Sequence, residues 1–285
     1  MSNFNEDSAI LILSDMEGVS GLIDKRLVFS GTPFWREYGR HLLTDDINTV
    51  AEACFKQGFK TIYLSEAHYT GKNTVPESLL PFIRVLPSCS AQTNLKGVKI
   101  WDEIYKDKNI VAAIMVGIHS MENTNGYLAH SWDGNIFKNI KINGEIHGEI
   151  GTIAALLGYY DIPLISIVGD SEAAKEAGEC IKGIKAISIK ELGKDGWIKA
   201  LPPDKAHEII YKEILSCLED FSMIKPFKLN GNVTMSFELK DKTKLKSFEN
   251  YNGVSIINDV ISINAIDYKE AYNIFWNCYL KIWLE

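Results

Sequence analysis

The chain has 285 residues, of which 46% are hydrophobic and 24% charged, values typical of a globular protein with a substantial core. Its net charge is −7 and its basic residues form no cluster, which argues against nucleic acid and anionic membranes as partners. No apolar run approaches the roughly 20 residues of a membrane span, and the polar start MSNFNEDS lacks the pattern of a secretory signal, so we expect a cytoplasmic protein. The cysteines are odd in number, form no C-x-x-C pair and are expected to be reduced: Cys54, Cys89, Cys180, Cys217 and Cys278.

The first part of the chain alternates between strand-like and helix-like stretches. Residues 10–14, which begin with four apolar residues, predict a strand. Residues 34–57 carry apolar side chains at helical spacing up to Gly58 and predict a helix. Residues 61–65 predict a second short strand, and the run NIVAAIMVG over 109–117 predicts a buried one. Continuous apolar strands separated by helices are typical of a parallel or mixed sheet that is covered on both faces.

The middle of the chain continues this pattern. Alternation in IFKNIKINGEIHG, with Asn143-Gly144 at its centre, predicts a hairpin. A helix over 149–157 and a strand over 164–168 follow. We therefore predict an α/β fold with a mostly parallel sheet covered by helices, forming a metal-binding catalytic domain over residues 1–192.

After about residue 190 the pattern changes, which predicts a smaller C-terminal α+β part over residues 193–285. Helices are expected near 204–218 and over 267–284, with strands in NVTMSFEL and VSIINDVISINAI between them. The last helix carries two stripes, one of Ile274, Cys278 and Ile282 and one of Trp276, Tyr279 and Trp283. One stripe can face the core, and the spacing leaves open whether the other packs inside the protein or forms an assembly surface.

Two carboxylates follow the first strand in the stretch ILILSDMEGVSG. Asp15 and Glu17 are two residues apart, so on extended backbone both side chains point the same way. Two unpaired carboxylates at a buried strand end repel each other and lose hydration, and a divalent cation between them removes that cost. Gly18 would let the backbone turn sharply there. The alternative for this motif alone is a solvated turn.

Two further strands end on histidines. His68 closes IYLSEAH and His119 closes AAIMVGIH, so both occupy the position that Asp15 occupies in the first strand. The carboxyl ends of parallel strands meet at one edge of a sheet. Imidazole nitrogens and carboxylate oxygens are the usual ligands of catalytic zinc. The sequence therefore predicts a metal site at this edge.

Other candidate residues are more ambiguous. His130 lies in LAHSW after a glycine-containing loop, and Glu149 lies in HGEIG at a predicted helix start, where a glutamate is often only a partner of the helix dipole. His147 is a plausible ligand by type, and spacing alone does not exclude it. His41 and His207 lie on predicted helices among polar neighbours and are expected at the surface.

Six blocks in this order resemble the motifs of the zinc-dependent D-aminopeptidases of the dipeptide-transport-operon type: SDMEGVSG, EAH, VGIHS, AHSW, INGEIHGEIG and GYYDIPLISIVGD. The resemblance spans residues 10–170 and continues more weakly to the C-terminus. It implies that two zinc ions are bound by Asp15, Glu17, His68, His119 and Glu149. It also implies a catalytic role for His130, and it leaves His147 at a position that the family pattern does not use. Two stretches depart from the family pattern and put substrate preference in question. The family has an N-D-S-H-like block where this chain has SEAH, and LGKDGWIKALPP lacks an expected arginine.

The expected activity is hydrolysis of short peptides or aminoacyl amides with a free N-terminus by a dinuclear zinc aminopeptidase, with manganese or cobalt as alternative metals. The resemblance implies selectivity for D-residues or glycine and a ring-like homo-oligomer. We expect His130 to transfer a proton or stabilise an oxyanion, a nucleophilic role being the alternative.

The rival functions are a metal-dependent phosphohydrolase and a non-catalytic, metal-stabilised oligomeric binding protein. The histidines disfavour the first, which would use hard oxygen ligands for magnesium, and the presence of His130 disfavours the second.

Overall fold

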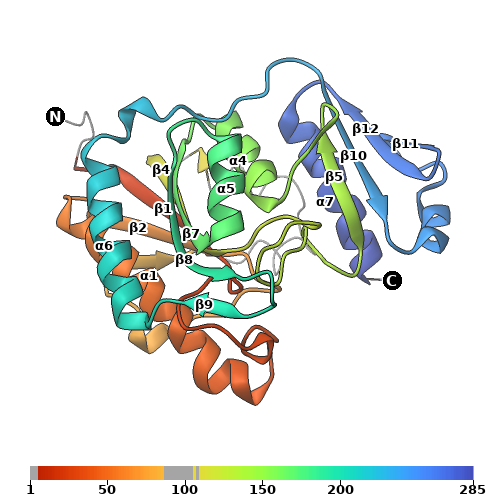
Figure 1. Ribbon diagram of the computed structural model, residues 1–285. Coiled ribbons are helices and arrows are strands. Elements are labelled where there is room, and N and C mark those ends of the chain that lie inside the picture. Colours follow the sequence, from red (N-terminus) through yellow and green to blue (C-terminus); the bar gives the residue numbers. More distant parts are fainter. Residues whose placement is uncertain (1–5, 87–104, 107–108, 285) are drawn as a thin grey trace.

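The computed structural model describes residues 6–86, 105–106 and 109–284 and contains two β-sheets with helices packed around them (Figure 1). The strands are β1 (Ala9–Ser14), β2 (Thr61–Glu66), β3 (Ile83–Val85), β4 (Ile110–Ile118), β5 (Phe137–Ile142), β6 (Glu145–Ile146), β7 (Leu164–Asp170), β8 (Lys185–Leu192), β9 (Ile198–Ala200), β10 (Val233–Leu239), β11 (Val254–Ile257) and β12 (Val260–Ala265). The helices are α1 (Arg40–Lys56), α4 (Glu149–Tyr159), α5 (Ser171–Cys180), α6 (Pro203–Glu219) and α7 (Tyr268–Leu284).

The larger sheet confirms the predicted α/β class. Its order is β3-β2-β1-β4-β7-β8-β9, and every neighbouring pair is parallel except β8 and β9. Helices α1 and α6 pack together over one face, and α4 and α5 lie on the other (Figure 1). Because both faces are covered, the central strands are mostly apolar, and β1 is buried along its whole length.

The register of the central strands brings the predicted site residues to one edge. Ser14 at the end of β1 pairs with Glu66 at the end of β2 on one side and with Val116 of β4 on the other. Asp15, His68 and His119 follow these strand ends within two residues. Three segments far apart in sequence therefore deliver their polar side chains to the same place.

The second sheet is antiparallel, in the order β11-β12-β10-β5-β6, and α7 packs against β10, β12 and α4 (Figure 1). The predicted hairpin is confirmed: β5 and β6 are joined by Asn143 and Gly144, both with positive φ. β5 lies before residue 192 and pairs with β10, which lies after it, so this sheet is assembled from both parts of the chain. The division at residue 192 stays a prediction.

The free cysteines and the first helix also agree with the sequence. Cys54, Cys180, Cys217 and Cys278 are free thiols in the structure, while Cys89 lies outside the described residues. Within the described ranges, the helices are too short or too polar to traverse a bilayer. The predicted helix over 34–57 is also present, with a π-helical turn over Trp35–Gly39 leading into α1.

Candidate metal centre and active site

The loop after β1 is held tightly against the end of β4. The Asp15 amide donates to the carbonyl of Val116 over 2.8 Å, and the Gly18 amide donates to the carbonyl of Gly117 over 2.7 Å. A Cβ atom on Gly18 would lie 2.1 Å from the Ile118 carbonyl oxygen. Gly18 is therefore required for close backbone approach. The chain also turns here, as expected, because the Val19 amide donates to the Met16 carbonyl over 3.2 Å.

The first cluster of candidate ligands consists of Asp15, Glu17 and His68, all buried. Nδ1 of His68 lies 2.9 Å from Asp15 Oδ1 and 3.4 Å from Glu17 Oε2. Nε2 of the same ring is 2.8 Å from the Val28 carbonyl, which can only accept, so Nε2 carries a hydrogen. This bond fixes the ring and turns Nδ1 toward the carboxylates, the orientation found in metal-ligating histidines.

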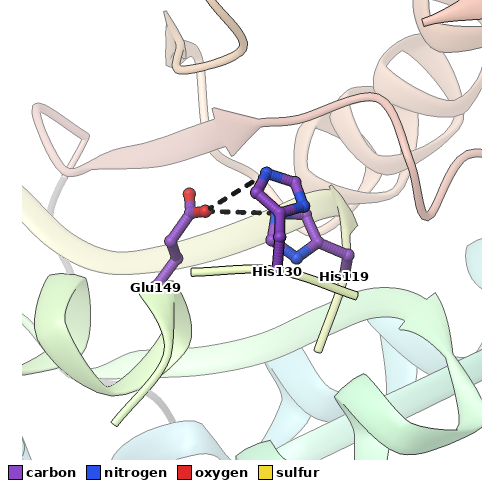
Figure 2. Close-up of side chains that lie close together, drawn as sticks. All are labelled: His119, His130 and Glu149. Carbon is purple, nitrogen blue, oxygen red and sulfur yellow. Dashed lines mark ion pairs between the residues drawn. The ribbon is translucent and has the colours of Figure 1, made fainter. Parts of the chain in front are cut away.

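The second cluster consists of His119, His130 and Glu149, drawn in Figure 2. Glu149 begins α4, and its Oε1 lies 3.2 Å from His119 Nε2 and 3.9 Å from His130 Nε2. The two imidazole rings stack with centroids 3.9 Å apart. Nδ1 of His119 donates to the Ser120 carbonyl over 3.0 Å, so Nε2 is the nitrogen that faces the carboxylates.

Asp15 joins the two clusters. Its Oδ1 faces His68, and its Oδ2 lies 3.4 Å from His119 Nε2. Burial alone would raise the pKa of Asp15, but the neighbouring imidazoles of His119 and His68 hold it well below its usual value. A single carboxylate thus presents one oxygen to each half of the site.

Negative charge dominates the electrostatics of the two histidines. Burial alone would lower the pKa of both rings, but Glu17 and Asp15 raise that of His68 well above its usual value. Glu149 and Asp15 do the same for His119. Three buried carboxylates around two imidazoles therefore favour bound positive charge, which either protons or metal cations can supply.

The donor set fits divalent metal ions. Among the described residues, His119 Nε2 is buried and makes no hydrogen bond, although two carboxylate oxygens lie within 3.4 Å. Imidazole nitrogen and carboxylate oxygen in each cluster form the ligand combination typical of zinc. His147 belongs to neither cluster: it is half-buried and lies near Phe227.

His130 lies in a strained loop at the more open side of the second cluster. Its side chain is 23% exposed, whereas that of His119 is 1% exposed. Nδ1 of His130 donates to the Leu128 carbonyl over 2.9 Å, which leaves Nε2 as the acceptor nitrogen. Leu128 and Trp132 on either side both have positive φ, a conformation that side-chain-bearing residues rarely adopt and that clusters at functional sites.

Some residues that support the site carried no recognisable sequence signal. The backbone N–H of Trp132 donates to Glu149 Oε1 over 2.8 Å. The buried ammonium of Lys190 donates to the carbonyls of Glu17 and Leu22 over 2.7 and 2.8 Å and thereby holds the loop that carries Glu17. Burial lowers the pKa of Lys190 to about 8. The alternating strand pattern around Lys190 gives no hint that this lysine points inward.

One expectation about histidines is wrong and one holds. His207 is half-buried and lies 3.0 Å from Oδ1 of Asp46, a completely buried residue, so it is not a free surface residue. The amide of Ser20, three residues after Glu17, donates to the other oxygen of Asp46 over 2.8 Å. His41 is exposed, as predicted.

Both clusters open into a cavity of about 480 Å³. Its polar end is lined by Asp15, Glu17, His68, His130 and Glu149. The rest of its lining comes mainly from residues 28–29, residues 65–70, the loop around Trp132, α4 and α7, and the side chains from α7 are aromatic or aliphatic. A buried cluster of ligand-type groups at one end of an apolar cavity is the usual arrangement of an enzyme active site.

Known proteins resemble the chain over almost its whole length. A family model described as D-aminopeptidase matches residues 9–277. A D-aminopeptidase from Bacillus subtilis (strain 168) is 27% identical over 260 residues, which cover 90% of this chain and 92% of the relative. The solved structure of a Zn-dependent D-aminopeptidase from Bacillus subtilis, a self-compartmentalizing protease, shares the fold with a TM-score of 0.84 at 24% identity, covering 95% of this chain and 96% of that one. Because the family model spans most of the sequence, the chain belongs to the D-aminopeptidase family of peptidases, as the motifs predicted.

Proposed function

We propose that the protein is a dinuclear zinc aminopeptidase that hydrolyses short peptides or aminoacyl amides with a free N-terminal amine. The observation that carries this proposal is the position of Asp15, whose two carboxylate oxygens face the histidines of two separate clusters. A carboxylate so placed is suited to bridge two cations. The Zn-dependence of the structural relative supports zinc as the metal, with manganese and cobalt as alternatives.

The proposed ligands divide between two ions. Glu17 and His68 would hold one ion, His119 and Glu149 would hold the other, and Asp15 would belong to both. Bound zinc lowers the pKa of water toward ~7 and polarises a peptide carbonyl. The backbone N–H of Trp132 on Glu149 and the carbonyl of Val28 on His68 keep these two ligands oriented.

His130 is proposed as the group that moves protons. Its Nδ1 is engaged with the Leu128 carbonyl, so Nε2 is free to accept a proton on the cavity side and to return it to the leaving amine. Its greater exposure relative to His119 lets a substrate reach it. In the protonated state, the same Nε2 can donate to the oxyanion that develops on the attacked carbonyl.

The requirement for a free amine follows from the chemistry of the site. A neutral substrate amine could coordinate a zinc ion held by Asp15, Glu17 and Glu149, which line the cavity. Holding the amine there places the adjacent carbonyl beside the reacting groups, and such positioning contributes several kcal/mol to lowering the barrier. The D-aminopeptidase relatives support a preference for D-residues at this position.

The test is a matched substrate set: the D-alanyl, L-alanyl and glycyl amides, each with a free and an N-acetylated amine, assayed with zinc-loaded enzyme. We expect acetylation to lower kcat by roughly 100-fold or more, because the amine positions the carbonyl in the transition state. Faster cleavage of the D-alanyl than of the L-alanyl amide is expected. Equal cleavage of free and acetylated substrates would show that the protein is not an aminopeptidase.

A further inference from the structure

The aromatic stripe of α7 lines the catalytic cavity. Trp276, Tyr279 and Trp283 all contribute to the cavity wall. The other stripe of α7 faces the core, with Cys278 and Ile282 buried. The aromatic stripe of α7 therefore faces the same cavity into which both ligand clusters open.

This aromatic wall is connected directly to the candidate metal site through Trp132. The backbone N–H of Trp132 holds Glu149. The Trp132 ring makes an edge contact with Trp276 at a centroid distance of 5.2 Å and a tilted contact with Tyr279 at 6.2 Å. Trp132 adopts a left-handed backbone conformation with φ +62. In this conformation its amide reaches Glu149 while its ring contacts Trp276 and Tyr279. The apolar wall and the polar end are parts of one continuous cavity.

The wall offers apolar surface. The indole N–H of Trp132 is engaged by Thr152 Oγ1 over 3.2 Å, so this ring contributes mainly its faces. Ile153 and Leu156 lie on the same side of α4 as Glu149, one and two turns further along, and also line the cavity. A substrate group placed here would meet aromatic rings and aliphatic side chains.

The size of the cavity exceeds the needs of the smallest substrates. Its volume of about 480 Å³ lies within the range of about 300–1,000 Å³ typical of pockets for drug-sized ligands. An alanyl or glycyl substrate held at the metal site carries no side chain large enough to cover the aromatic wall, so the exposed part of this wall, with Trp283 46% exposed, would remain in water. A large apolar side chain would bury it and gain the corresponding hydrophobic free energy.

We infer that the wall formed by Trp132, Trp276, Tyr279 and Trp283 is a specificity subsite for an aromatic or large aliphatic side chain next to the scissile bond. The preferred substrates are then short peptides or aminoacyl amides that carry such a residue. This inference rests on the proposed aminopeptidase function and adds the class of side chain that the enzyme selects.

The test uses the zinc-loaded wild-type protein and two substrate series. In the first, aminoacyl amides vary from glycine through alanine and leucine to phenylalanine, each chiral one in both enantiomers. In the second, Gly-X dipeptides vary in the same way at the second residue. We expect kcat/KM to rise by about 10- to 100-fold from alanine to phenylalanine in one of the series. Equal values across both series would overturn the inference and leave the aminopeptidase function intact.

A binding measurement separates the two proposals. If zinc-loaded protein hydrolyses none of these compounds, the proposed function fails, and calorimetric titration with the same amides still tests the subsite. We expect phenylalanine amide to bind about tenfold or more tightly than alanine amide, or Gly-Phe than Gly-Ala. Equal affinities within both pairs would overturn the subsite.

A matched pair of variants locates the effect. Trp283 lines the cavity and is 46% exposed, so Trp283→Ala should fold, and we expect it to lower the phenylalanine-to-alanine ratio of kcat/KM by about tenfold. Trp197 is 78% exposed and does not line the cavity, so Trp197→Ala should preserve the ratio. An unchanged ratio in Trp283→Ala would contradict the assignment of this wall.

Discussion

Asp15 acquires its position from backbone constraints on both sides. Its own amide is bound to β4, and the chain two residues later passes so close to the end of β4 that only glycine is accommodated at position 18. These contacts turn the carboxylate toward the histidines that follow β2 and β4. In the motif D-x-E-G, the two carboxylates are therefore proposed metal ligands, and the glycine allows the close packing of the loop after β1 against the end of β4.

His130 is the residue whose role is most open to direct test. Because Nε2 of His119 already faces Glu149 and Asp15, the second proposed ion has three ligands without His130. We expect His130→Ala to retain zinc and to lose roughly 10²–10⁴ in kcat, the usual cost of removing one acid–base or oxyanion group. Metal analysis and steady-state kinetics on the same preparation check both parts. Loss of an ion from this variant would instead identify His130 as a ligand.

The residues that sequence reasoning found differ physically from those that it missed. Asp15, Glu17, His68 and His119 were recognisable because polar side chains interrupt apolar runs at strand ends. Lys190 acts through its ammonium, which donates to backbone carbonyls, and Trp132 acts through its backbone amide. Neither contact can be recognised from the local sequence. Contacts of this kind depend on which distant segments meet, and that depends on the tertiary fold.

At the level of elements, the central strands were predictable because they are continuous apolar runs. The short helix α5 and the edge strands β3 and β9 were not predicted, since they are only three to ten residues long and carry mixed polarity. The pairing of β5 with β10 joins residues that are about one hundred positions apart, and no local pattern encodes it. The second stripe of α7 was recognised, but its role as a cavity wall required the structure.

The packing of α1 on α6 includes an ion pair that predicts a pH dependence of stability. The hydrogen bond with Asp46 of α1 raises the pKa of His207 on α6 above its usual value. A raised pKa in the folded state means that this stabilisation is complete below the unfolded-state pKa of about 6.5 and is lost as the pH rises through the folded-state value. We expect His207→Ala to lower the free energy of unfolding by about 1–2 kcal/mol at pH 6 and by less at pH 9.

Chemical denaturation of the wild type and the variant at both pH values measures this difference. His41→Ala is the matched control, because His41 is an exposed histidine of the same helix α1. It should have little effect at either pH. A His207→Ala effect that grows with pH would contradict the assigned ion pair.

At the scale of the whole molecule, we propose a homo-oligomer, supported by the self-compartmentalizing structural relative. The aromatic stripe of α7 is accounted for by the cavity, so the assembly surface is expected elsewhere. Multi-angle light scattering at micromolar concentration should give a mass several times the 32.0 kDa of one chain. A mass equal to one chain would refute the proposal.

Metal counting on one substitution tests most directly whether Asp15 is shared between two metal ions. Wild-type protein loaded with zinc and freed of excess metal should contain close to two ions per chain. Asp15→Ala should lose metal and activity together, because each proposed ion loses a ligand. His147→Ala, which alters a histidine outside both clusters, should keep both. Retention of two ions in Asp15→Ala, or an equal loss of metal from His147→Ala, would contradict the account.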